Sequence, residues 1–187
     1  SNYGKLPIKV HGTNYSKPIK FYENKGSAQC KSAVMFAALN TQGETIIKAK
    51  KSRDHSELLF KHLKLPIKVI KRKYYDIIKV KGKHKIPALN YKIPSDISSA
   101  AFFIVLTALV KNSSLKIRNV NINPSRMGIF YILKLMGVKI TKINIRNYKG
   151  EKIADLLIKS TNSIKPINCP INLNSSAIDE FLLIFLV

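Results

Sequence analysis

The chain has 187 residues, 45% of them hydrophobic, which suits one or two globular domains with a substantial core. It has no run of roughly 18 apolar residues, which excludes a membrane-spanning helix. Its 33 basic and 10 acidic residues give a formal net charge of +23, a value that would usually suggest nucleic acid or an acidic membrane as partner. The lysines are instead spread along the chain and alternate with isoleucine, as in residues 66–71, which is typical of solvated strand faces. We therefore expect no specific nucleic-acid partner and no membrane partner.

The first part of the chain contains two predicted helices, each followed by strands. Ser27 opens an apolar helix that we expect to end at Leu39, and residues 40–43 turn into a strand at 44–50. Asp54 opens a second helix, expected over 54–63, with Glu57 placed for a capping box. Alternating apolar and polar residues then predict strands at 67–71 and 75–81.

The same order of elements recurs after about 72 residues. Residues 95–99 open a second apolar helix, expected over 100–110, and a strand is expected at 115–120. Asn123 caps a helix expected over 127–136, with Pro124 in its first turn, and strands are expected at 138–145 and 153–159. A third copy starts at 174–180, and we expect its apolar residues 181–187 to form a buried helix that is cut short.

This alternation of helices and strands indicates an α/β (α+β) fold. The first helix of each copy is apolar almost all round, so we expect other elements to surround it. Pro87 and Pro94 make residues 85–94 the best candidate for a link between two lobes.

The cysteines and histidines bear on the cellular location of the protein and on metal binding. Cys30 and Cys169 stand alone, without the spacing of a metal or redox pair, which fits a reducing compartment and a cytoplasmic location. We see no signal peptide at the start. The four histidines make no cluster with metal-ligand spacing, so we expect no metal.

Two predicted helix starts carry polar and charged residues suited to anions. Backbone N–H groups at a helix N-terminus are unpaired and carry a positive partial charge, so they bind anions readily. Ser27 and Gln29 add side-chain donors at one start, and Arg53 adds a planar guanidinium at the other. Two such starts together indicate a phosphorylated substrate, whereas each start taken alone is more often an ordinary N-cap, here Ser27 and Asp54.

Six segments together resemble the 5-enolpyruvylshikimate-3-phosphate synthase family. They are Ser27-Ala28-Gln29-Cys30-Lys31-Ser32-Ala33, Arg53-Asp54-His55-Ser56-Glu57, Asp96-Ile97-Ser98-Ser99-Ala100-Ala101-Phe102, Asn123-Pro124-Ser125-Arg126-Met127-Gly128, Met136-Gly137-Val138 and Ile178-Asp179-Glu180-Phe181. Their order and spacing match the family over nearly the whole chain. The sister family, UDP-N-acetylglucosamine enolpyruvyl transferase, shares the architecture but generally lacks the Ser-Ala-Gln and Arg-Asp-His pairing.

The resemblance implies two lobes of repeated βαβαββ units with buried parallel helices. Residues 1–93 would form the latter part of the first lobe, and residues 94–187 the first part of the second. Family segments that contact both substrates are absent, namely an N-terminal Gly-Asp-Lys-Ser, an Asn-Gly-Gly-Thr with its phosphoenolpyruvate-binding Arg, and the Lys and Arg residues after the catalytic Asp. We therefore expect this stretch alone to be inactive. The resemblance also implies that the full-length family form is a monomer.

The resemblance also implies roles for individual residues. Ser27, Ala28 through its backbone, and Gln29 would bind shikimate 3-phosphate, and Gln29 would also approach phosphoenolpyruvate. Arg53 would reach the phosphate or carboxylate of shikimate 3-phosphate. Asp179 would bind substrate and accept the proton of the 5-hydroxyl as that oxygen attacks C2 of phosphoenolpyruvate. This 3-phosphoshikimate 1-carboxyvinyltransferase reaction releases phosphate, serves aromatic amino acid synthesis and needs no cofactor.

Other interpretations stay open at this point. We interpret Arg126 and Asp96 as capping or lobe-contact residues, Glu180 as structural, and Lys31 as the partner of a carboxylate or carbonyl in a buried helix. The alternative functions are transfer to a UDP-N-acetylglucosamine acceptor and a non-catalytic module that binds anions or nucleic acid.

Overall fold

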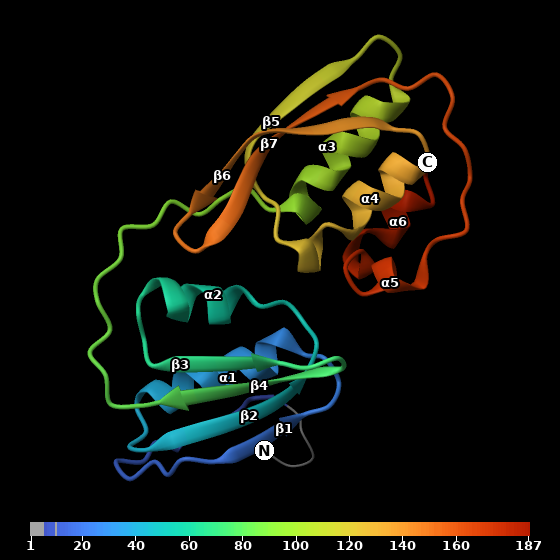
Figure 1. Cartoon of the computed structure of the whole chain (residues 1–187). Coiled ribbons are helices and arrows are strands. Elements are labelled where there is room, and N and C mark those ends of the chain that lie inside the picture. The colour runs from blue at the N-terminus through green and yellow to red at the C-terminus, as the bar shows by residue number, and fades with distance from the viewer. Residues whose placement is uncertain (1–5, 10) are drawn as a thin grey trace. The chain divides into compact units, whose positions relative to one another are not determined.

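A computed structural model describes residues 6–9 and 11–187 as two compact units (Figure 1). One unit combines the chain up to Lys51 with Lys64–Ile86, and the other combines Ser52–Leu63 with Pro87–Val187. The second helix predicted in the chain, at residues 54–63, thus belongs to the second unit by its contacts. The assignment of 1–93 and 94–187 to two lobes of a larger fold stays a prediction.

The first unit is a four-stranded sheet with one helix. Its elements are β1 (Lys20–Glu23), α1 (Ala28–Leu39), β2 (Glu44–Lys50), β3 (Ile67–Lys71) and β4 (Tyr75–Lys81). The strand order is β1-β2-β4-β3, with β1 parallel to β2 and the other pairs antiparallel. Helix α1 packs against β2 and β4. The three predicted strands of this unit are confirmed with their predicted bounds, and β1 was not predicted.

Alternation along β2 explains why this sheet has one covered face. Thr45, Ile47 and Ala49 are buried, whereas Lys48 and Lys50 on the opposite face are exposed. Side chains of successive strand residues point to opposite faces, so the lysines of the alternating pattern lie on the open face. The predicted solvated lysine face is therefore confirmed for this strand.

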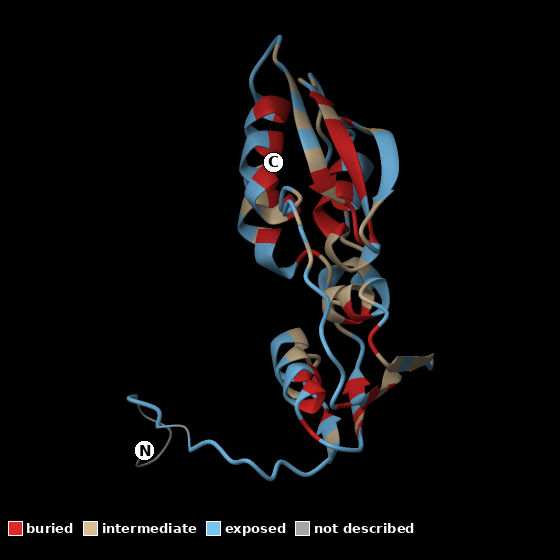
Figure 2. Cartoon of the chain, turned by 90° about the vertical axis from the view of Figure 1, so that its left-hand side faces the viewer, coloured by how far each residue is buried: buried red, intermediate tan, exposed pale blue. Residues whose placement is uncertain are grey.

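The second unit is a three-stranded antiparallel sheet, in the order β5-β7-β6, with helices packed on one face. Its elements are α2 (His55–His62), α3 (Ile97–Leu109), β5 (Ser114–Asn121), a 3-10 turn (Pro124–Arg126), α4 (Gly128–Leu135), β6 (Lys139–Tyr148), β7 (Glu151–Lys159), α5 (Ile171–Asn174), a second 3-10 turn (Ile178–Glu180) and α6 (Phe181–Ile184). Figure 2 shows the buried residues in red along inner helix and strand faces. Ile104, Ile129, Ile132 and Leu156, all fully buried, lie in this core.

The helices α1 and α3 each keep an exposed apolar face, which corrects the expectation that other elements surround them. Phe36 of α1 is 48% exposed, and Phe102 and Phe103 of α3 are 63% and 60% exposed. The physical reason is geometric, because a single sheet covers only one face of a helix lying on it.

The end of the chain also differs from the prediction. Instead of one buried helix, residues 178–184 form a 3-10 turn followed by the four-residue helix α6. Ala177 and Ile184 are buried, but Leu182 and Phe185 are 81% and 77% exposed. Helices α3 and α4 pack against α6, and the exposure of Leu182 and Phe185 shows that part of this apolar segment stays uncovered. The short helix α5 was not predicted either.

A buried carboxylate on β7 organises both neighbouring strands. Register shifts interrupt β5 between Ile117 and Val120, and β6 between Ile143 and Arg146. Asn119 and Asn144 adopt positive φ angles of 55° and 52° there, a conformation that asparagine tolerates better than most residues. Asp155 accepts a hydrogen bond from the Asn119 backbone N–H and another from the Asn144 amide, each at 3.0 Å. One carboxylate therefore satisfies a polar group at each bulge.

No helix within residues 6–9 and 11–187 combines the length and the apolar character needed to cross a bilayer. The longest of them, α3, has 13 residues.

Candidate functional site

Arg53 and Asp179, two predicted site residues, meet in the second unit. Arg53 lies just before α2, and Asp179 lies in the 3-10 turn that leads into α6. The Arg53 guanidinium donates to Oδ2 of Asp179, and Nη1 of Arg126 donates to the same oxygen at 3.4 Å. The structure thus brings together two residues that are 126 positions apart, and it adds a second arginine to the pair.

Arg126 connects Asp179 with the N-terminus of α3. Its Nη2 donates to Oδ1 of Asp96 at 2.9 Å and also to the Ser98 hydroxyl. Asp96 caps α3, as expected, by accepting from the Ser99 backbone N–H at 3.0 Å. The Arg126 side chain is only 15% exposed, so these bonds form in a partly dry setting where charge-assisted bonds are strong. The link from Arg126 to Asp179 was not predicted, because spacing alone does not show it.

The two acidic residues of this turn have different environments. The Ser98 hydroxyl donates to the carboxylate of Glu180, which is buried. Burial raises the pKa of Glu180 above its ordinary value, although the Ser98 hydrogen bond and the Arg126 charge act in the opposite direction. Asp179 is about half exposed and faces two guanidinium groups. Glu180 is therefore placed to support the turn, as expected, whereas Asp179 is accessible to a ligand.

Asp96 keeps its negative charge to low pH. Burial raises its pKa, but the Ser99 backbone hydrogen bond and the Arg126 charge lower it more, so the pKa lies below its ordinary value. Asp96 and Asp179 consequently offer Arg126 two carboxylates.

A close approach of two backbones fixes the turn that carries Asp179. The Gly128 N–H, at the start of α4, donates to the Ser176 carbonyl at 3.1 Å. A Cβ atom at position 128 would lie 2.6 Å from the Ala177 nitrogen, which is closer than real Cβ atoms come. Only glycine allows α4 to back this turn so closely.

Residues 52–63 are held by polar contacts at their start. Asp54 makes no side-chain cap bond with α2, so the Asp54 half of the expected capping box is not formed. Its Oδ1 instead accepts from the Asn123 amide at 2.9 Å. Next to it, His55 Nδ1 lies 2.6 Å from Oε1 of Glu151. Asn123, which is distant in sequence, thus binds the Asp54 carboxylate that would otherwise cap α2.

A cavity of about 350 Å³ in the second unit adjoins these groups. Arg53, Arg126, His55, Tyr91, Asp96 and Glu151 are among the residues that line it. Two guanidinium groups that open on one cavity can hold a phosphate or a carboxylate through paired N–H donors. The arrangement can therefore hold an anionic group in this cavity, and both arginines also bind the Asp179 carboxylate.

The other predicted binding residues lie in the first unit, at the start of α1. The Ser27 hydroxyl accepts from the Cys30 backbone N–H at 3.2 Å, so the expected N-cap is confirmed. Ala28 begins the helix, and Gln29 in its first turn is exposed. These residues leave helix N–H groups beside an exposed amide, a combination suited to an anion.

Glu23 shapes the loop before α1, which the sequence alone did not indicate. Its carboxylate accepts from the backbone N–H groups of Lys25 at 2.9 Å and Gly26 at 2.8 Å. Burial raises the pKa of Glu23, but backbone hydrogen bonds from Ser27, Lys25 and Gly26 and the charge of Lys31 lower it more. Lys31 is buried in α1, and its effect on Glu23 agrees with its expected proximity to a carboxylate.

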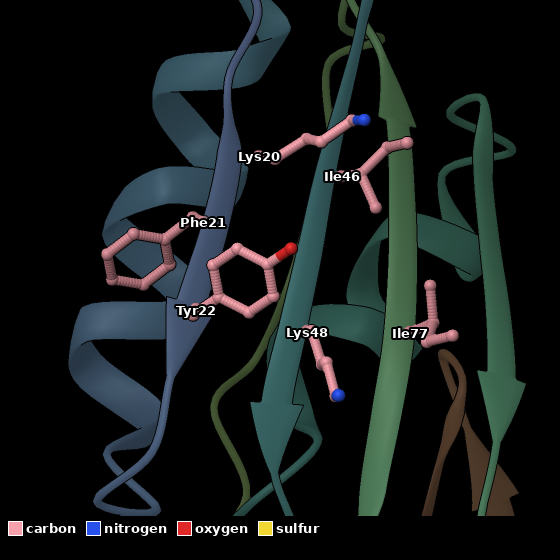
Figure 3. Close-up of a pocket in the computed structure, with 6 residues that line it drawn as sticks. All are labelled: Lys20, Phe21, Tyr22, Ile46, Lys48 and Ile77. Atoms are coloured by element: carbon pink, nitrogen blue, oxygen red, sulfur yellow. The ribbon is translucent and has the colours of Figure 1, made fainter.

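A second cavity, of about 170 Å³, lies on the sheet of the first unit (Figure 3). Tyr22, Lys48 and Ile77 line it together with Lys20, Phe21 and Ile46. No carboxylate, histidine or thiol is among these residues.

Among residues 6–9 and 11–187, no three His, Cys, Asp or Glu side chains gather as a metal site. Cys30 and Cys169 are unpaired.

Comparisons with known proteins point to one family. A family model described as EPSP synthase (3-phosphoshikimate 1-carboxyvinyltransferase) matches residues 1–186. The 3-phosphoshikimate 1-carboxyvinyltransferase of Vesicomyosocius okutanii is 42% identical over 187 residues, which are all of this chain and 42% of that protein. The Caldicellulosiruptor bescii protein of the same name is 42% identical over 158 residues, covering 84% of this chain and 36% of the relative.

Solved structures agree. An EPSP synthase structure from Acinetobacter baumannii superposes with a TM-score of 0.85 at 35% identity, over 100% of this chain and 42% of that one. Another, at 2.37 Å, gives a TM-score of 0.81 at 36% identity over 92% of this chain and 38% of that one. The chain thus spans about two fifths of the length of the proteins that it matches.

Proposed function

The chain belongs to the EPSP synthase family, and from this premise we propose that it takes part in enolpyruvyl transfer. The proposed reaction moves the enolpyruvyl group of phosphoenolpyruvate to the 5-hydroxyl of shikimate 3-phosphate and releases phosphate. It is a transferase step of the shikimate pathway toward aromatic amino acids. Because the chain spans 42% of its relative, we propose that it supplies part of the site and does not turn over alone.

The observation that carries this proposal is the convergence of Arg53 and Arg126 on Asp179. A dianionic phosphate competes with a carboxylate for a guanidinium, so bound shikimate 3-phosphate draws Arg53 away from Asp179. The Asp179 carboxylate is then available to take the 5-hydroxyl proton as that oxygen bonds to C2 of phosphoenolpyruvate, whose C2–C3 double bond opens as C3 takes up a proton. Loss of inorganic phosphate from C2 and of a proton from C3 restores the double bond and completes the addition–elimination.

Ser27, Ala28 and Gln29, in the first unit, are further residues that we propose to bind shikimate 3-phosphate. The Ser27 hydroxyl, the Ala28 backbone N–H and the Gln29 amide are donors for the substrate phosphate, and the N-terminus of α1 adds its partial positive charge. In this proposal Gln29 also approaches phosphoenolpyruvate.

No cofactor enters the proposed reaction, since acid–base chemistry and anion binding suffice. The unpaired cysteines support a cytoplasmic location. The proposal includes no specific nucleic acid and no membrane as partner, and it takes the full-length family form as a monomer.

Ligand titrations of the 187-residue chain test the proposal. We expect shikimate 3-phosphate to shift the backbone NMR signals of residues 27–29 and the side-chain signal of Arg53. UDP-N-acetylglucosamine should leave them unchanged, and phosphoenolpyruvate alone should not bind measurably. Equal or stronger shifts with the UDP-sugar would favour the sister transferase, and no shift with shikimate 3-phosphate would overturn the assignment.

A filter-binding titration with single- and double-stranded DNA at two salt concentrations addresses the binding-module alternative. The enzyme assignment predicts weak association that disappears near physiological salt. Tight binding with a steep salt dependence would favour a nucleic-acid module instead.

A further inference from the structure

We propose that Glu151, at the tip of the β6–β7 hairpin, is a positioning residue that keeps the Arg53 guanidinium beside Asp179 by holding residues 52–63. Its functional meaning rests on the proposed substrate role of Arg53. The contact pattern itself does not depend on that role.

Both oxygens of the Glu151 carboxylate make polar contacts with neighbouring side chains. Oε1 lies 2.6 Å from His55 Nδ1, and Oε2 accepts from the amides of Asn121 at 2.7 Å and Asn123 at 3.5 Å. Glu151 is only 9% exposed, so water does not easily replace these partners. One carboxylate therefore ties the start of α2 to the end of β5.

Asn123 makes the second attachment. Its Nδ2 donates to Oδ1 of Asp54 at 2.9 Å, and its Oδ1 accepts from the Ser125 N–H at 2.9 Å. Asp54 and His55 are thus both held, and Arg53 directly precedes them. With this backbone fixed, only the side-chain torsions of Arg53 decide where its guanidinium lies.

The turn before Glu151 lies against α2 itself. Gly150 has a φ of +91°, and a Cβ there would lie 3.0 Å from the Leu58 carbonyl oxygen and from the His62 Cβ. Helix α2 therefore contacts the hairpin along its length as well as at its first residue. The contact is steric and polar at once, which suits positioning better than a single surface ion pair.

The same hairpin tip also holds residues 87–94. The Lys92 backbone N–H donates to the Tyr148 hydroxyl at 3.0 Å, and the rings of Tyr91 and Tyr148 lie 5.5 Å apart. Both segments that enter this unit from the other one are consequently anchored at residues 148–151. The Glu151 bonds are the part of this anchor that bears on Arg53.

Loss of the Glu151 carboxylate should let the start of α2 move and release Arg53 from Asp179. The test compares the 187-residue chain with Glu151→Ala and with the isosteric Glu151→Gln. Glu44→Gln is the matched control, since Glu44 also pairs with a basic side chain, Lys79 at 3.3 Å, but lies in the other unit.

The first readout needs no ligand. Phenylglyoxal modifies accessible guanidinium groups, and mass spectrometry reports the rate at Arg53. We expect Glu151→Ala to raise that rate several-fold, Glu151→Gln to restore part of the protection through its retained hydrogen bonds, and Glu44→Gln to leave it unchanged. An unchanged Arg53 rate in a folded Glu151→Ala chain would overturn the proposal.

The second readout is shikimate 3-phosphate affinity in a double-mutant cycle. Glu151→Ala should weaken binding by no more than Arg53→Ala does, and it should have no further effect in the Arg53→Ala background. Equal losses in both backgrounds would show a general structural role and contradict positioning through Arg53. If the unaltered chain binds no shikimate 3-phosphate, the proposed function fails, while the modification rates still decide the positioning role.

If circular dichroism shows that Glu151→Ala is unfolded, His55→Ala takes its place as the test variant. The His55 side chain is 38% exposed, and its removal eliminates the same contact with Glu151. The expected rise in Arg53 modification is the same, and an unchanged rate again overturns the proposal.

Discussion

The Arg53 guanidinium donates to the Asp179 carboxylate within one compact unit, although the two residues are 126 positions apart in the chain. A basic group suited to a substrate phosphate and an acidic group suited to a substrate hydroxyl are thus adjacent.

Arg53→Ala should weaken shikimate 3-phosphate binding by roughly 10- to 100-fold, because a charge-assisted hydrogen bond contributes about 1.5–3 kcal/mol. Arg53→Lys should have an affinity between those of the unaltered chain and Arg53→Ala, since an ammonium keeps the charge but lacks the planar pair of donors. Isothermal titration calorimetry measures the affinities. Arg118→Ala is the control, because Arg118 is an exposed arginine of the same unit. Equal losses for Arg53→Ala and Arg118→Ala would mean that only overall charge matters.

Asp179→Ala should lower turnover by about 10²–10⁴-fold, the usual contribution of a positioned general base, and leave shikimate 3-phosphate binding mostly intact. Removing this carboxylate frees both arginines, so the anion site loses no donor. Turnover is measured in a chimaera in which this chain replaces the aligned part of the Vesicomyosocius okutanii enzyme. A loss of binding equal to the loss of turnover would contradict the assignment of Asp179 as the base.

Asp155 should make the second unit sensitive to acid. Hydrogen bonds from the Asn119 backbone and the Asn144 side chain lower the pKa of Asp155 to about 2, against an ordinary 3.8. A lowered folded-state pKa means that this stabilisation is present above pH 3.8 and is lost as the pH falls toward 2. Urea unfolding midpoints between pH 5 and pH 2 should therefore fall more steeply for the unaltered chain than for Asp155→Asn. Parallel curves would contradict this account.

Gly128→Ala should destabilise the second unit by about 1–3 kcal/mol, the usual cost of overpacking, because its Cβ would meet the Ala177 backbone. The 3-10 turn with Asp179 must then shift, so the NMR signal changes that shikimate 3-phosphate causes in the chain should differ as well. Gly12→Ala is the control, since nothing lies within 4 Å of a Cβ there. Chemical denaturation measures both variants, and equal stability of the two would refute the close-approach argument.

Sequence patterns predicted those parts of the fold that depend on neighbours in the chain. The strands β2, β3 and β4 have their predicted bounds because alternation is a local signal. Strand β1 has only four residues and pairs with β2, which lies beyond α1, so its existence depends on a distant partner. The end of the chain was predicted as one helix because its residues are apolar, whereas the structure has only the four-residue helix α6 there, with Leu182 and Phe185 exposed.

The candidate site divides in the same way. The Ser27 and Asp96 caps are local, and the sequence showed both. Asp54 was expected to cap its own helix, but Asn123, 69 residues later, provides its observed hydrogen bond. The family resemblance marked Arg53 and Asp179 as site residues, but their pairing was not predicted, because no spacing rule connects residues so far apart.

The arrangement around Asp155 has an evolutionary consequence. Because its two oxygens serve Asn119 and Asn144 on opposite neighbouring strands, neither asparagine is independent of the other. A lineage that replaces the aspartate loses the selective reason for a left-handed residue at both bulges. The three positions should therefore covary as a group among relatives, and the two bulges should appear or vanish together.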